Sequence, residues 1–114
     1  MKSPPELLQI IEKLCRQLTN KNDEYQGLAD DRAEAEKEYK MAVREQILRH
    51  KSDGHPATLI PKLVEGHKAV AELKFQMDVK EALVKANLES VKSTVTQIDA
   101  VRSMLTWLRA EMGG

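Results

Sequence analysis

Apolar residues recur at every seventh position along two long stretches of the chain, residues 4–51 and 67–112. In the first stretch they form two rows, which polar Lys21 and Arg32 interrupt. The members are Leu7, Leu14, Leu28, Ala35 and Ala42 in one row and Ile11, Leu18, Tyr25 and Tyr39 in the other. The second stretch has one unbroken row, Met77, Val84, Val91, Ile98, Leu105 and Met112, flanked by Leu73, Leu88 and Val95. Such heptad spacing is typical of long helices that pack side by side, so both stretches are predicted to be helical.

The first helix has a clear predicted start. Ser3 and Glu6 on either side of Pro4 form a capping-box pattern, with proline at the first helical position. The heptad phase continues unchanged from Leu18 to Tyr39, which favours one continuous helix. The polar run at residues 19–23 and Gly27 favour instead a break or kink within residues 20–27, and this alternative stays open.

Helix-breaking residues gather in the middle of the chain, at residues 52–66, a segment that we call the elbow. Asp53-Gly54 predicts a turn. Thr58 is expected to cap a short helix that has Pro61 in its first turn and Gly66 at its end. We therefore predict an all-α fold and a single domain over residues 1–114. It is a long, coiled-coil-like antiparallel two-helix hairpin with helices at about 4–51 and 67–112 and a short helix at the bend.

Two paired helices leave part of the apolar surface uncovered, because each helix hides only one stripe. Residues such as Val43, Ile47 and Phe75 lie off the seam, the contact line that the heptad rows form. We therefore expect a homo-oligomer, a dimer or higher, most simply a four-helix bundle of two hairpins. The residues expected to mediate self-association are Met77, Val84, Val91, Ile98, Leu105 and Trp107. The alternatives are a monomer whose elbow helix covers the excess and, for Trp107, core packing against Leu7, Leu8 and Ile11.

Charge is balanced overall, with 18 basic and 18 acidic residues, but it is unevenly distributed. Residues 1–39 have six Lys/Arg against nine Asp/Glu, a net of −3, and residues 40–80 have eight against five, a net of +3. The basic tip comprises Arg44, Arg49, Lys51, Lys68 and Lys74. It favours an acidic partner, whereas direct nucleic-acid binding is only weakly supported, because acids are interleaved and aromatic residues are few.

The residue types that usually carry chemistry are sparse. Asp30, Glu34 and Glu38 lie on one helix face, but the inward Glu-x-x-His motifs of di-iron bundles are missing, so a solvated face is expected. His50, His55 and His67 all lie around the elbow, without a spacing that forces them together. We expect no metal, no cofactor, no catalytic residue and no enzyme activity.

The lone Cys15 follows the Leu14 seam position, which predicts a buried or half-buried thiol. A single cysteine, an N-terminus without an apolar signal core, and no long apolar run together predict a cytoplasmic protein that does not enter a membrane.

Three segments resemble a group of small, uncharacterised helical proteins encoded by tailed bacteriophages and prophages. They are Pro56-Ala57-Thr58-Leu59-Ile60 followed by Gly66, then Val70-Ala71-Glu72-Leu73-Lys74-Phe75, and the ending Val101-Arg102-Ser103-Met104-Leu105-Thr106-Trp107-Leu108-Arg109. The similarity covers most of residues 25–112 and is weakest before Tyr25. An Arg-Asp pair typical of the group is replaced by Met77-Asp78, so the basic residue of that pair is missing from this chain. The resemblance implies a phage product in the host cytoplasm, often encoded near recombination or replication functions, and no enzyme activity.

Together these observations predict a non-enzymatic, oligomeric helical protein of phage origin that acts by protein binding, as an accessory factor in phage DNA recombination or replication. The alternative is a phage inhibitor of a host protein such as a defence nuclease, and a metal-dependent helical hydrolase is a third class. The residues expected to contact an unidentified phage or host protein are His55, Thr58, Leu59, Ile60, Lys62 and Leu63.

Overall fold

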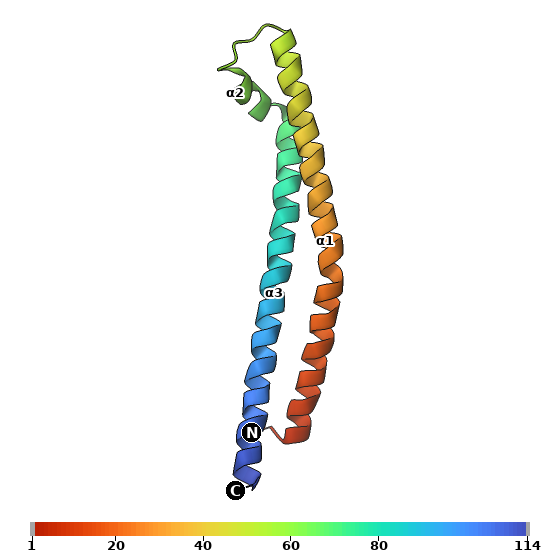
Figure 1. The fold of residues 1–114 in the computed structure, drawn as a ribbon, viewed down its shortest axis with the longest axis vertical. Helices are drawn as coiled ribbons and strands as arrows, with labels where there is room; N and C mark the ends of the chain where they lie inside the picture. Colours follow the sequence, from red (N-terminus) through yellow and green to blue (C-terminus); the bar gives the residue numbers. More distant parts are fainter. Residues whose placement is uncertain (1, 114) are drawn as a thin grey trace. The chain divides into compact units, whose positions relative to one another are not determined.

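The computed structural model describes residues 2–113, which contain three helices and no strand (Figure 1). Helix α1 spans Pro4–Ser52, α2 spans Ile60–Glu65 and α3 spans Lys68–Gly113. The predicted all-α fold, with two long helices and a short helix at the bend, is confirmed, and the predicted bounds differ by one residue at most for the long helices. Assembly into a four-helix bundle stays a prediction. So does the single domain, whose predicted range also includes residues 1 and 114, outside the described part.

Helix α1 begins as its capping pattern predicts and continues without interruption. The Ser3 hydroxyl accepts a hydrogen bond from the backbone N–H of Glu6 (3.4 Å) and donates one to the Glu6 carboxylate (3.1 Å). The helix is unbroken across residues 20–27, so continuity, the favoured alternative, is confirmed. Gly27 has no atom within 4 Å of where a Cβ would lie, so no tight contact there requires a glycine.

Contacts divide the described residues into two units. The bend unit comprises residues 27–84, that is, the second half of α1, all of α2 and the first part of α3. The open-end unit comprises residues 2–26 and 85–113, where the remaining parts of α1 and α3 run side by side in opposite directions. Each unit has its own buried residues.

The seam of the open-end unit combines apolar and polar layers. Leu7, Leu14 and Leu105 are buried, as are two polar residues of α3, Asn87 and Thr94. Leu88 and Val95, which the apolar pattern placed beside the seam, are instead 43% and 41% exposed. A search for apolar positions alone therefore missed that α3 turns Asn87 and Thr94 toward α1.

These polar seam residues are paired with Lys21, the residue that interrupts the apolar row of α1. The Lys21 ammonium donates a hydrogen bond to Thr94 Oγ1 (2.7 Å), and the Asn87 side-chain amide donates one to the Lys21 carbonyl (3.0 Å). Thr94 in turn donates its hydroxyl hydrogen to the Ser90 carbonyl (3.0 Å). We call Lys21, Asn87 and Thr94 the polar layer, because the polar residue in the apolar row of α1 contacts two polar residues of α3 across the seam.

Several predicted placements need correction. Leu105 is 6% exposed and buried by its own chain, and its role in self-association stays a prediction. Met77, Val84, Val91 and Ile98 are half-buried by the same chain, as expected of seam positions. Cys15 is exposed, because it lies one residue beyond the seam, so the predicted burial of its thiol is wrong.

Trp107 is 54% exposed, which contradicts the alternative of core packing against Leu7, Leu8 and Ile11. The aromatic ring thus remains available on the surface of the open-end unit. No helix within residues 2–113 has both the length and the apolar character needed to cross a bilayer.

Candidate binding site at the helical bend

The chain reverses direction immediately after α1 through a short hydrogen-bonded turn. The backbone N–H of Gly54 bonds to the Lys51 carbonyl (3.1 Å), and the N–H of His55 bonds to the His50 carbonyl (3.2 Å). Gly54 has φ +83°, a left-handed conformation that side-chain-bearing residues rarely adopt. The turn predicted at Asp53-Gly54 is therefore confirmed, and it directs His55 back toward the end of α1.

Helix α2 is short and is held by packing rather than by a strong cap. Its N-cap is Leu59, without a side-chain hydrogen bond, so the prediction that Thr58 caps it is wrong. Pro61 lies in the first turn as predicted, because that turn needs no N–H from it. Gly66 ends the helix as predicted, with its N–H bonded to the Lys62 carbonyl (3.0 Å).

The core of the bend unit lies beneath α2. Ile60, Val64 and Val70 are 4%, 5% and 2% exposed and form one apolar cluster. Partly buried side chains of α1 pack against this cluster: Tyr39, Ala42, Val43 and Ile47. Helix α2 is thus attached to α1 and to the start of α3 through this cluster of three buried residues.

Above this cluster lies an apolar groove of about 610 Å³, which we call the bend groove. All three helices and the segment before α2 contribute to it. It is lined by Tyr39, Val43, Ile47, Lys51, Ala57, Ile60, Pro61, Val64, Glu65, Val70, Ala71 and Lys74. Three of these side chains carry charge, and the others give the groove a mainly apolar wall.

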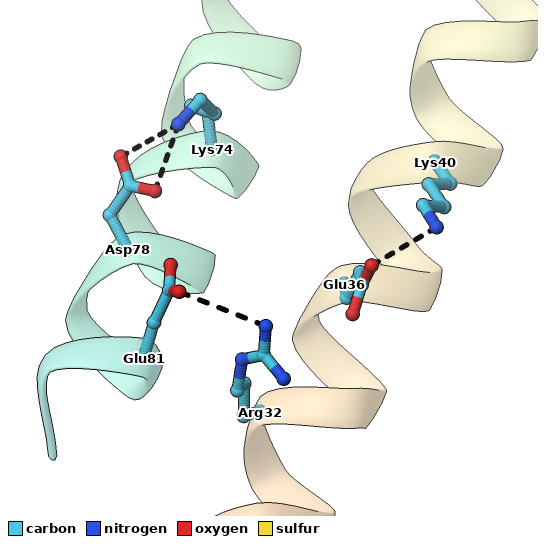
Figure 2. Close-up of polar contacts among 6 residues, drawn as sticks. All are labelled: Arg32, Glu36, Lys40, Lys74, Asp78 and Glu81. Carbon is cyan, nitrogen blue, oxygen red and sulfur yellow. Dashed lines mark hydrogen bonds and ion pairs between the residues drawn. The ribbon is translucent and has the colours of Figure 1, made fainter. Parts of the chain in front are cut away.

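Figure 2 shows three of the ion pairs that tie charged side chains of the bend unit together. Lys74 contacts both carboxylate oxygens of Asp78, at 2.8 and 2.9 Å. The hydrogen bond with Asp78 raises the pKa of Lys74 above its usual value. Between the helices, Arg32 of α1 lies 3.8 Å from Glu81 of α3. Arg32, like Lys21, interrupts an apolar row of α1, and it too has a polar partner on the other helix.

The third ion pair joins Lys40 to Glu36 on α1 at 3.0 Å, and the hydrogen bond from Lys40 lowers the pKa of Glu36. Both groups are on the surface, where such pairs contribute little to stability.

The predicted basic tip divides into paired and unpaired cations. Arg49 lies 3.6 Å from Glu45, and Lys74 is paired with Asp78. The remaining predicted members, Arg44, Lys51 and Lys68, are exposed and form no ion pair within residues 2–113, and the same holds for Lys62 on α2. The unpaired side chains make the surface around the bend locally positive.

The predicted partner-contact residues occupy three kinds of position. His55, Thr58, Leu59 and Lys62 are exposed, and Leu63 is half-buried. Ile60 lines the floor of the bend groove and belongs to the core cluster. The prediction missed most of the groove, whose wall comes from α1 and α3 as well as the elbow. The apolar residues Val43 and Ile47, which lie off the seam in the sequence pattern, were the signal that could have indicated the groove.

A second groove of about 610 Å³ lies on another part of the bend unit. It is lined by Glu38, Met41, Ala42, Arg44, Glu45, Leu48 and Leu73. Met41 and Leu48, seven residues apart on α1, are 62% and 55% exposed. On α3, Phe75, Val79 and Leu83 follow one another at four-residue spacing and are 60%, 38% and 44% exposed. Large apolar side chains thus remain uncovered on both long helices.

The structure brings together two of the three histidines. The rings of His50 and His55 meet edge to face with their centroids 5.3 Å apart, and Asp53 lies beside them. His67, at the start of α3, is not part of this cluster.

Comparisons with protein-family models, with curated proteins and with solved structures found no match to this chain, so the resemblance to phage proteins stays a prediction.

Proposed function

We propose that the chain is a non-enzymatic binding protein whose bend groove holds an apolar segment of a protein partner. The observation that carries this proposal is the apolar groove formed by three helices over the Ile60–Val64–Val70 cluster. Proteins often bind an amphipathic segment of a partner in a preformed apolar groove, which receives a few anchoring side chains of that segment. The described residues that line it include no histidine or cysteine and only one carboxylate, Glu65, which supports binding rather than catalysis.

The charges around the groove define the partner further. Lys51 lies in the groove wall, and Arg44, Lys62 and Lys68 surround the bend without ion pairs within residues 2–113. Complementary charge steers association and fixes the orientation of a bound segment. The partner segment therefore combines apolar anchors with acidic residues.

We propose that the apolar side chains outside the groove bind a second copy of the chain. Phe75, Val79 and Leu83 lie on one face of α3, because residues four apart are neighbours on a helix. The open-end unit adds Trp107, a residue type often found at the centre of interfaces. Contiguous exposed apolar surface of this kind marks interaction sites.

The biological setting of the proposal rests on the resemblance to small phage proteins. On that basis, the binding role belongs to an accessory factor in phage DNA recombination or replication, in the cytoplasm of the host. A phage inhibitor of a host protein would use the same groove, with the host protein supplying the apolar, acidic segment.

A peptide selection tests the groove. The full-length chain is immobilised and exposed to a random peptide library. We expect enriched peptides to carry apolar residues at helical spacing together with Asp or Glu. Replacing Ala71 in the groove wall with glutamate places a charge among apolar side chains, and glutamate is compatible with the α3 backbone. Affinity for the enriched peptides should fall at least about tenfold in A71E, measured by fluorescence anisotropy.

Ala82 supplies the matched control for this experiment. It is exposed on the same helix and does not line the groove, so A82E adds the same charge elsewhere and should leave peptide affinity unchanged. Failure to enrich any peptide, or enrichment of peptides that bind A71E as tightly as the unchanged chain, would contradict the proposal.

A further inference from the structure

Three metal-ligating side chains converge where α1 ends. One ligand atom from each of His50, Asp53 and His55 lies within 4.8 Å of the others. The turn explains this convergence, because the left-handed Gly54 and the bond from the His55 N–H to the His50 carbonyl fold the chain back over the last turn of α1. Residues three and five positions after His50 are thereby brought to its side chain.

The His50 ring has unmet bonding capacity. Both of its nitrogens are buried and lack a hydrogen-bond partner within residues 2–113. A buried polar group without a partner destabilises a fold, so an imidazole in this state calls for an explanation. The neighbouring groups are another imidazole and a carboxylate, which together with His50 form a set of donors suited to a cation.

We infer that His50, Asp53 and His55 bind a divalent transition-metal ion, Zn²⁺ in the first instance. Two imidazoles and one carboxylate suit zinc and its neighbours rather than Mg²⁺ or Ca²⁺, which prefer oxygen ligands. With zinc–ligand bonds of about 2.0–2.1 Å, tetrahedral donors lie roughly 3.3 Å apart. His55 and Asp53 are exposed, so rotation of their side chains can close the remaining distance.

The position at the end of α1 also favours a cation. The last carbonyl groups of a helix carry partial negative charge, which stabilises positive charge nearby. Of the two other basic residues in that last turn, Arg49 is already paired with Glu45. A bound ion would hold the turn at residues 53–55 against α1 and so restrain the segment that leads into α2. This inference does not depend on the bend groove having a partner.

Metal titration of the tag-free, full-length chain tests the site, because a polyhistidine tag would bind the same ions. We expect calorimetry to show one Zn²⁺ per chain. Co²⁺ should give visible absorption bands, and zinc should shift the NMR signals of residues 50–55. Removing one ligand in H55Q or D53N should weaken zinc binding at least about tenfold. Even the loss of a residue that only hydrogen-bonds to a metal ligand weakens metal affinity by about this factor. Both residues are exposed, so these variants should keep the far-UV circular dichroism of the unchanged chain.

His67 provides the matched control, since it is the remaining histidine and lies outside the cluster. H67Q should bind zinc as tightly as the unchanged chain. The inference is overturned if the unchanged chain binds no stoichiometric zinc, if H55Q and D53N both retain its affinity, or if H67Q loses it.

Discussion

Replacing Ile60 with alanine is expected to detach α2 from the bend unit and to destroy the bend groove. Ile60 is one of the three buried residues of the cluster beneath α2. Truncating a buried isoleucine to alanine costs about 2–5 kcal/mol. Helix α2 has six residues and no side-chain N-cap, and so short a helix is not stable without packing. The loss should therefore appear as local unfolding of α2 rather than as loss of both long helices.

Hydrogen exchange followed by NMR measures this effect directly. In I60A, the backbone amides of residue 60 and of residues 62–65 should lose their protection, while amides of the open-end unit keep theirs. Leu59 provides the control, because it is adjacent in sequence but 42% exposed and outside the cluster. L59A should change protection little, as surface substitutions usually stay within about 0.5 kcal/mol. Unchanged protection of α2 in I60A would contradict this account of how the bend is held.

The second large effect concerns the polar layer of the open-end unit. Replacing Thr94 with valine removes the acceptor of the Lys21 ammonium while keeping the shape of the side chain. A hydrogen bond to a charged group contributes about 1.5–3 kcal/mol, so T94V should lower the free energy of unfolding by about that amount. Denaturation in urea, followed by circular dichroism, measures it.

Replacing Lys21 together with Thr94 is expected to recover the free energy of unfolding that T94V loses. Apolar residues that replace a buried ion pair often leave stability unchanged or raise it by about 1–4 kcal/mol, because no charged group is left buried without a partner. By the same reasoning, Lys21→Met combined with Thr94→Val should unfold at higher urea concentration than T94V alone, because the half-buried Lys21 ammonium is then removed together with its acceptor. If T94V destabilises and the double variant does not recover that loss, the two residues do not act as a pair.

Thr96 separates the contribution of Lys21 from that of the threonine itself. It is exposed, and its hydroxyl bonds to the Lys92 carbonyl (3.0 Å), just as the Thr94 hydroxyl bonds to that of Ser90. T96V therefore removes the same local hydrogen bond without touching Lys21. Equal destabilisation by T94V and T96V would show that the bond across the seam contributes nothing. In helical coiled coils, single polar seam residues fix which layers of two helices face each other, and we expect the polar layer to do the same.

Helix positions could be predicted from the chain because two local signals agree. The heptad rows run through both long helices, and Ser3, Gly54 and Gly66 lie where helices begin or end. The polar layer could not be predicted from apolar periodicity, because Asn87 and Thr94 are polar although they are buried in the seam. Their place in the seam depends on where Lys21 lies on the other helix.

The candidate sites depend still more on tertiary structure. The bend groove is built from three helices, so Val43, Ala57 and Ala71 become neighbours only after α2 has packed. Likewise, His50 and His55 have no recognised metal-binding spacing. They meet because Gly54 adopts a positive φ, which a list of residue types does not reveal.

We propose that the exposed apolar side chains are interfaces and not merely uncovered surface. Multi-angle light scattering during size-exclusion chromatography, over a range of micromolar concentrations, tests it most directly. We expect a mass of at least twice the 12.9 kDa of one chain. Phe75→Glu should reduce this mass, because Phe75 is 60% exposed on the face of α3 that it shares with Val79 and Leu83. A mass of one chain at every concentration would contradict the claim.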